Sequence, residues 1–212
     1  MKRIQIIDGL RGFCIILVVA YHLGFNLVER EYLPLGAIDN LLLNILQPFF
    51  AGVFILLAGV SSRLSRNNFK RGAQLAGCAL LVTGVSIAFD SPIYFGILHL
   101  LAACILLYAL IEKLRVPAAL FMALGAFFAV YFQVTRWPVM RSADYFPLLP
   151  WGFLFFFGVL LGTPIGEGKF PKWFYETKVP IFPAIGRKTL LIYLLHQPVL
   201  YGGLWLVETF VG

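Results

Sequence analysis

Charged residues are scarce in this chain. Only 13% of its 212 residues are Asp, Glu, Lys or Arg, whereas a soluble globular domain carries about 25%. Hydrophobic residues make up 60% of the sequence, aromatic residues 16%, and the mean hydropathy is +0.87. A composition this poor in charge excludes an ordinary soluble domain and predicts an integral membrane protein.

Cysteine is scarce as well. The three cysteines, Cys14, Cys78 and Cys104, all fall within hydrophobic runs, and an odd number in apolar surroundings excludes a disulfide framework. The sequence contains no internal repeat, no low-complexity tract and no glycine-rich phosphate loop between a strand and a helix. We also expect no bound metal.

Long hydrophobic runs take up most of the chain. Crossing about 30 Å of hydrocarbon takes around 20 residues, and lipid admits only helices or closed barrels. The runs lack the alternation of barrel strands, so we expect an all-α polytopic membrane bundle of about seven transmembrane helices, forming one domain over residues 1–212. The seven runs are 10–29, 39–62, 72–89, 92–112, 117–134, 145–163 and 188–210. The first is too long for the apolar core of a cleaved signal peptide and has no A-x-A-like site at its end.

The positive charges are distributed unevenly between the predicted loops. With a cytoplasmic N-terminus, 14 of the 17 lysines and arginines fall on the cytoplasmic side, which is the bias that sets membrane orientation. Only Arg30, Arg136 and Arg141 fall on the other side. The net charge of +7 is therefore interpreted as a topology signal, and binding to nucleic acid is not expected.

Polar residues lie on one face of the stretch "IDGLRGFCIILVVAYHLGFN" (residues 7–26), which overlaps the first run. At 100° per residue, Asp8, Arg11, His22 and Asn26 fall within an arc of roughly 60°, and Arg11 lies about 16 Å from His22 along the axis. Polar residues inside a membrane are costly and are functional candidates by default. The alternative is structural: Asp8 pairs with Arg11 at the interface, and His22 bonds to another helix.

The other two histidines lie at a similar depth in other predicted helices. His99 is about seven residues from the outer end of the fourth run, and His196 is about eight residues from the inner end of the seventh, so all three imidazoles lie near the bilayer midplane. They could converge on one cavity. Each of His99 and His196 could equally be a structural histidine.

The second run carries amides at its start and a basic segment after its end. Asn40, Asn44 and Gln47 share one face and could bind a polar substrate or bond to other helices. The small residues of "AGVFILLAGVSS" favour close helix packing. The basic segment is a topology signal that could also bind an anionic ligand such as the phosphates of a nucleotide-bearing cofactor; it contains Arg63, Arg66, Lys70 and Arg71.

Five blocks, in order, resemble the bacterial members of a known family. They are "RIQIIDGLRGFCIILVVAYHLGFN", "FFAGVFILLAGVSSRLS", "FGILHLLAACILL", "YFPLLPWGFLFFFGVLLG" and "GRKTLLIYLLHQPVL". The resemblance is to the heparan-alpha-glucosaminide N-acetyltransferase catalytic-domain family, within a wider transmembrane acyltransferase superfamily. The spacing of Arg11 and His22 is also similar to the first-helix signature of the acyltransferase-three proteins, which have more helices.

The resemblance implies a transferase that moves an acetyl or other short acyl group from cytoplasmic acetyl-CoA to a hydroxyl or amine across a bacterial inner membrane. The lysosomal enzymes of the family are longer, and their lumenal-loop histidine has no match here, which favours a cell-envelope glycan over heparan sulfate as the acceptor. The implied catalytic residues are His22, His99, His196 and Asp8. Those for acyl-CoA are Arg11, Arg63, Arg66, Arg71, Arg187 and Lys188. Those for the acceptor are Asn26, Asn40, Asn44, Gln47 and Gln197.

Other functions remain open from the residues alone. Histidines near the bilayer midplane and charged residues at the start of the first helix would also suit a proton-coupled transporter. Two of the histidines could instead ligate haem in an electron carrier. A structural membrane protein is a further alternative. A retinal protein is excluded, because no predicted transmembrane helix carries a mid-helix lysine. Lipid is an expected partner, and the apolar surface is compatible with a homodimer.

Overall fold

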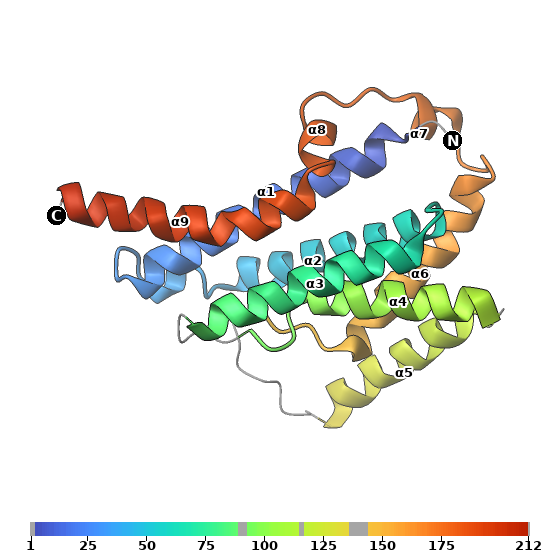
Figure 1. The fold of residues 1–212 in the computed structure, drawn as a ribbon, viewed down its shortest axis with the longest axis horizontal. Helices are drawn as coiled ribbons and strands as arrows, with labels where there is room; N and C mark the ends of the chain where they lie inside the picture. The colour runs from blue at the N-terminus through green and yellow to red at the C-terminus, as the bar shows by residue number, and fades with distance from the viewer. Residues whose placement is uncertain (1–2, 89–92, 115–116, 136–143, 212) are drawn as a thin grey trace. The chain divides into compact units, whose positions relative to one another are not determined.

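The computed structural model describes residues 3–88, 93–114, 117–135 and 144–211. In these residues the chain forms nine α-helices and a short 3-10 helix, with no strand (Figure 1). Six of the helices are long and apolar enough to cross a bilayer. The predicted all-α polytopic fold is therefore confirmed, and the chain is an integral membrane protein.

The long helices follow the predicted hydrophobic runs. They are α1 (Gln5–Glu29), α2 (Leu41–Arg63), α3 (Asn68–Ala88), α4 (Ile97–Leu114), α5 (Ala118–Thr135), α6 (Leu148–Gly166) and α9 (Thr189–Val211). Helix α5 matches the predicted run 117–134 but is not among the six. Shorter elements are η1 (Leu35–Ala37), α7 (Lys172–Glu176) and α8 (Phe182–Gly186).

The starts of α1 and α4 differ most from the predicted boundaries. Helix α1 begins at Gln5, which places Asp8 in its first turn, where a carboxylate interacts favourably with the helix dipole. Helix α4 begins at Ile97, later than predicted, because the Asp144 carboxylate accepts hydrogen bonds from the Ile97 backbone N–H at 3.3 Å and caps the helix. Hydropathy alone does not register either effect.

The chain divides into two compact units. Unit 1 comprises Met1–Phe54 and Pro171–Gly212, and unit 2 comprises Ile55–Phe170. Single-domain organisation and a cytoplasmic N-terminus stay predictions. Of the basic residues counted for the orientation, Lys2, Arg115, Arg136 and Arg141 lie outside the described residues.

Unit 1 is organised around α1, which contacts α7, α8 and α9 (Figure 1). Helix α8 approaches α1 so closely that a Cβ atom at Gly12 would overlap the Phe182 carbonyl oxygen. A Cβ atom at Gly186 would overlap the Asp8 carbonyl oxygen. The Phe13 ring lies between the two flanking helices of the unit, 5.7 Å from the Phe50 ring and 5.9 Å from the Phe182 ring.

Unit 2 contains α3 packed on α4, and α6 packed on α4 and α5. The backbone of α2 within this unit packs directly against the backbone of α6. A Cβ atom at Gly59 would overlap the Phe155 carbonyl oxygen, and one at Gly158 would overlap the Leu56 carbonyl oxygen. The close packing inferred from the small residues of this segment is thus present at Gly59. Buried side chains around it include Ile55, Leu100 and Phe155.

Candidate active site between helices α1 and α9

Helices α1 and α9 bring two of the three histidines together in unit 1. The ring centroids of His22 on α1 and His196 on α9 are 4.9 Å apart, with an angle of 54° between the ring planes. His196 is buried, at 8% exposure. Because residues 174 positions apart meet here, this pair is a product of the fold and not of local sequence.

The side-chain amide of Gln197 links this pair to Asn26. The Asn26 Nδ2 group donates to Gln197 Oε1 at 3.0 Å, and Gln197 Nε2 lies 3.0 Å from His22 Nδ1. The Asn26 side chain is fully buried, and its Oδ1 atom has no hydrogen-bond partner among the described residues. Leaving a buried carbonyl oxygen unsatisfied is costly, so this atom marks a place where a further donor can bind.

Two tyrosines flank the imidazoles. The Tyr193 ring lies 5.3 Å from the His196 ring, and its backbone carbonyl oxygen is 2.5 Å from His196 Nδ1. On α1, the Tyr21 ring meets the His22 ring edge-on at 6.0 Å. Neither tyrosine was among the predicted site residues, although Tyr193 stands at the helical i−3 position from His196.

Charged side chains connect the C-terminal parts of α1 and α9. Arg30 forms an ion pair with Glu208, and its guanidinium carbon lies 5.6 Å from the centre of the Tyr201 ring. The hydrogen bond to Glu208 raises the pKa of Arg30 above its ordinary value. The Tyr201 hydroxyl donates to Glu29 at 3.0 Å. Since His22 meets Gln197 and Arg30 meets Glu208, the two helices run in the same direction, and this contact helps to keep their register.

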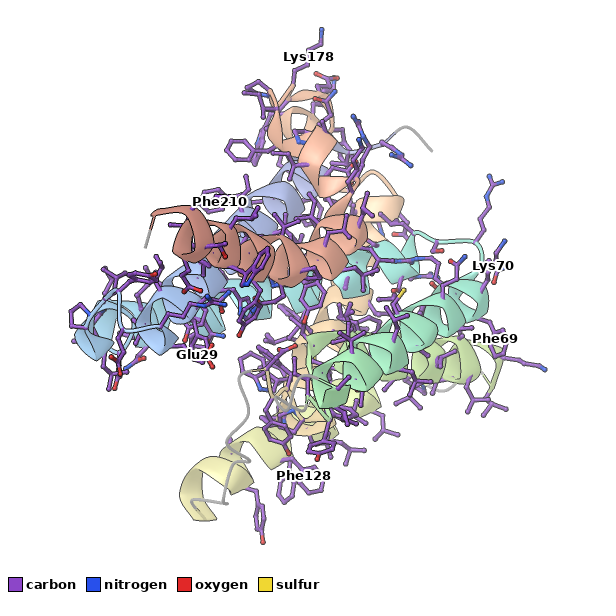
Figure 2. The ribbon with its side chains drawn as sticks, turned by 60° about the vertical axis from the view of Figure 1, so that its left-hand side comes forward. Glu29, Phe69, Lys70, Phe128, Lys178 and Phe210 are labelled. Atoms are coloured by element: carbon purple, nitrogen blue, oxygen red, sulfur yellow. The ribbon has the colours of Figure 1, made fainter. Side chains whose placement is uncertain are left out.

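Basic residues gather at the opposite end of unit 1. Gly186 contacts the backbone of α1 at Asp8 and Gly12, so Arg187 and Lys188 follow directly beside the turn of α1 that carries Arg11. Arg187 and Lys188 are exposed and Arg11 is half-buried. Figure 2 shows Lys178, from the segment between α7 and α8, projecting away from the helices.

The stretch of α1 between this basic end and His22 is apolar. By helix geometry Arg11 and His22 are about 16 Å apart along the axis, and Asp8 and His22 about 21 Å. Asp8 therefore lies with the basic residues and not beside the histidine pair. Ile15, on the same stripe, is buried at 1% exposure.

His99 has a separate environment in unit 2. Its Nδ1 atom accepts from the Gly96 backbone N–H at 3.2 Å, which leaves the proton of the neutral ring on Nε2. Nε2 lies 3.0 Å from Thr83 Oγ1, whose own hydroxyl donates to the Ile93 carbonyl oxygen at 2.7 Å. Both ring nitrogens thus have partners, and the contact with Thr83 holds the start of α4 against α3, which favours the structural interpretation of His99.

We expect the substitution His99→Leu to lower the free energy of unfolding by about 1–3 kcal/mol, because it leaves the Gly96 N–H without its acceptor. Thermal unfolding of the protein in detergent measures this change. The matched control is Leu110→Ala, which removes an exposed apolar side chain from the same helix. An unchanged melting temperature for His99→Leu would contradict the structural role.

The arginines of unit 2 that were predicted to bind acyl-CoA differ in their surroundings. Arg63 lies 3.6 Å from a Glu112 carboxylate oxygen and donates to Thr163 Oγ1 at 3.0 Å. Arg71 donates to the Ser61 carbonyl oxygen at 3.3 Å, whereas Arg66 is exposed. Lys70, beside them at the start of α3, also points outward (Figure 2).

The predicted acceptor-binding amides of α2 mostly serve their own helix. Asn40 Oδ1 accepts from the Leu43 backbone N–H at 3.0 Å, as in a helix N-cap, and Asn44 donates to Asp39 at 2.9 Å. Gln47 is half-buried in the next turn. The structure brings Asn26 and Gln197 to the histidine pair and leaves Asn40 and Asn44 in local contacts.

Comparison with known proteins identifies the family. A family model described as "Heparan-alpha-glucosaminide N-acetyltransferase, catalytic" matches residues 3–198. No curated protein and no solved structure matches the chain. The matched region includes His22, Asn26, His196 and Gln197, and the resemblance inferred from the sequence blocks is confirmed. The chain therefore belongs to the heparan-alpha-glucosaminide N-acetyltransferase catalytic family and is an acetyltransferase-type membrane enzyme.

Proposed function

We propose that this protein transfers an acetyl or other short acyl group from cytoplasmic acyl-CoA to a hydroxyl or amine of an extracytoplasmic sugar or glycan. The observation that carries the proposal is the His22–His196 pair with its Asn26–Gln197 amides, part-way along two membrane-spanning helices. An imidazole with an ordinary pKa near 6.5 can take a proton from an acceptor hydroxyl or amine. The cell-envelope glycan and the bacterial inner membrane are part of this proposal.

The basic end of unit 1 supports the donor side. Arg11, Arg187 and Lys188 would bind the phosphates of acyl-CoA through charge-assisted hydrogen bonds. From there the pantetheine arm would follow the apolar stripe of α1 for about 16 Å and deliver the thioester to the histidine pair. The predicted role of Arg66 and Arg71 of unit 2 in binding acyl-CoA stays a prediction, while Arg63 already has Glu112 and Thr163 as partners.

Asn26 supports a polar acceptor. Its Oδ1 atom is buried and lacks a hydrogen-bond partner among the described residues, and it belongs to the residue four positions after His22 on the same face of α1. A hydroxyl or amine of the acceptor could donate to this oxygen and be held next to the imidazoles. The acceptor would then lie on the far side of the histidine pair from Arg11.

Calorimetric titration of the detergent-purified protein with acetyl-CoA tests the proposal. We expect binding by the wild type and a dissociation constant raised about 10- to 100-fold by Arg11→Ala, because a hydrogen bond to a charged group contributes about 1.5–3 kcal/mol. His22→Ala should leave binding nearly intact. Lys113→Ala, which removes an exposed cation at the end of α4, is the control for lost positive charge.

A folded wild type that binds neither acetyl-CoA, nor CoA, nor longer acyl-CoAs would contradict the proposal. The histidine pair would then favour the proton-coupled transporter, since intramembrane histidines also serve as proton relays. If Arg11→Ala and Lys113→Ala weaken acetyl-CoA binding equally, the effect is a nonspecific loss of positive charge. Arg11 would then not be a specific ligand of the phosphates.

A further inference from the structure

We infer that the two paired histidines are held in opposite tautomers, so that His196 acts as the general base and His22 donates a hydrogen bond to the reacting carbonyl oxygen. Gln197 is the positioning residue that sets the tautomer of His22. The inference rests on the proposed acyl transfer and assigns the roles within it.

The hydrogen bonds around His22 determine where its proton lies. An amide nitrogen only donates, so Gln197 Nε2, 3.0 Å from His22 Nδ1, requires that Nδ1 accept. The neutral His22 ring therefore carries its proton on Nε2. In this state His22 is a donor at Nε2 and has no lone pair there to act as a base.

The surroundings of His196 produce the opposite result. Its Nδ1 atom lies 2.5 Å from the Tyr193 carbonyl oxygen, and a carbonyl oxygen only accepts. Nδ1 must donate, so the neutral ring has its lone pair on Nε2. Of the two rings, 4.9 Å apart, His196 is the one prepared to take a proton through Nε2.

Asn26 fixes which end of the Gln197 amide faces His22. The Asn26 Nδ2 group donates to Gln197 Oε1 at 3.0 Å, which occupies the oxygen and turns the nitrogen to the imidazole. Asn26 itself is fully buried on α1. Asn26 on α1 therefore donates to Gln197 on α9, and Gln197 donates to His22 on α1.

With His196 as the base and His22 as the hydrogen-bond donor, every proton and bond in the acyl transfer is accounted for. His196 Nε2 removes the proton of the acceptor hydroxyl or amine as its oxygen or nitrogen attacks the thioester carbonyl carbon, and the carbonyl oxygen becomes an oxyanion that accepts from His22 Nε2–H. When the intermediate collapses, the carbon–sulfur bond breaks and His196 returns the proton to the leaving sulfur. The products are the acylated acceptor and free CoA.

Nitrogen-15 NMR of histidine-labelled protein tests the inference. The chain contains only three histidines, so single substitutions assign the spectrum. At about pH 8, where an ordinary histidine is neutral, we expect His22 protonated on Nε2 and His196 on Nδ1. A wild-type spectrum with His22 protonated on Nδ1, or His196 on Nε2, overturns the inference even if acetyl transfer is intact.

The isosteric substitution Gln197→Glu tests the role of the amide. A carboxylate can still accept from Asn26 but can no longer donate to His22, so we expect the His22 proton to move to Nδ1 while His196 is unchanged. Loss of one oxyanion donor should lower kcat about 100-fold with little change in KM. A merely structural glutamine would lower stability without moving the tautomer signals. Gln74→Glu, exposed on α3, is the matched control.

Failure of the inference and failure of the proposed function give different results. If the wild type binds no acyl-CoA, the spectra still report both tautomers, and only the reaction assigned to them falls. If it binds and transfers acetyl but Gln197→Glu retains full kcat, the function stands and the role of Gln197 is wrong.

Discussion

Replacing His196 by alanine is expected to lower the kcat of acetyl transfer by roughly 10²- to 10⁴-fold, the contribution of a positioned general base. The residue is buried, lies 4.9 Å from His22 between ring centroids, and has its Nδ1 atom against the Tyr193 carbonyl oxygen. Binding of acetyl-CoA should change little, because its phosphates are proposed to bind at the other end of α1, near Arg11. Release of free CoA in the presence of acceptor measures the effect.

Two comparisons make this result specific. Leu195→Ala removes an exposed neighbour on the same helix and should retain activity, while the melting temperature of His196→Ala shows whether the protein is still folded. A folded His196→Ala protein with wild-type kcat would remove His196 from the chemistry and overturn its assignment as the general base.

The largest effect on stability is expected at the contact between α1 and α8. A side chain at Gly186 would overlap the Asp8 carbonyl oxygen and crowd the Gly12 backbone, and backbone atoms cannot move aside as a flexible side chain can. We expect Gly186→Leu to cost about 3 kcal/mol of unfolding free energy. It should also weaken acetyl-CoA binding, because Arg187 and Lys188 would shift away from Arg11.

The matched control is Gly203→Leu on α9, where a Cβ atom meets no other atom within 4 Å. Thermal unfolding and yield of folded protein after detergent extraction provide the measurement for both variants. Equal melting temperatures for Gly186→Leu and Gly203→Leu would contradict the close approach of α1 and α8.

The sequence was sufficient for much of the fold. Hydrophobic runs predict each long helix because both the bilayer and the helix impose one length scale, and a polar residue can shift a helix boundary that hydropathy predicts. Asp144 is such a residue: it caps α4 from a segment nearly fifty positions later. Periodicity also predicted that His22 and Asn26 share one face of α1.

The candidate site could be predicted only in part, because its contacts are tertiary. Nothing in the spacing of residues indicates that α9 lies along α1, so the pairing of His22 with His196 was one of several options. The amides were interpreted as acceptor ligands, yet Asn26 and Gln197 bond to each other and to His22. Asn40 caps its own helix. An amide side chain looks the same in a sequence whether its partner is a ligand, an imidazole or a backbone N–H.

The most direct test of acyl transfer across the membrane uses purified protein reconstituted into sealed vesicles. Acetyl-CoA carrying a radiolabelled acetyl group is supplied on the side of Arg11, and glucosamine or an envelope glycan fraction is enclosed on the other side. We predict labelled, acetylated acceptor inside the vesicles, with none formed by His196→Ala. Folded, correctly oriented protein that leaves both acceptors unlabelled and releases no CoA would contradict the account.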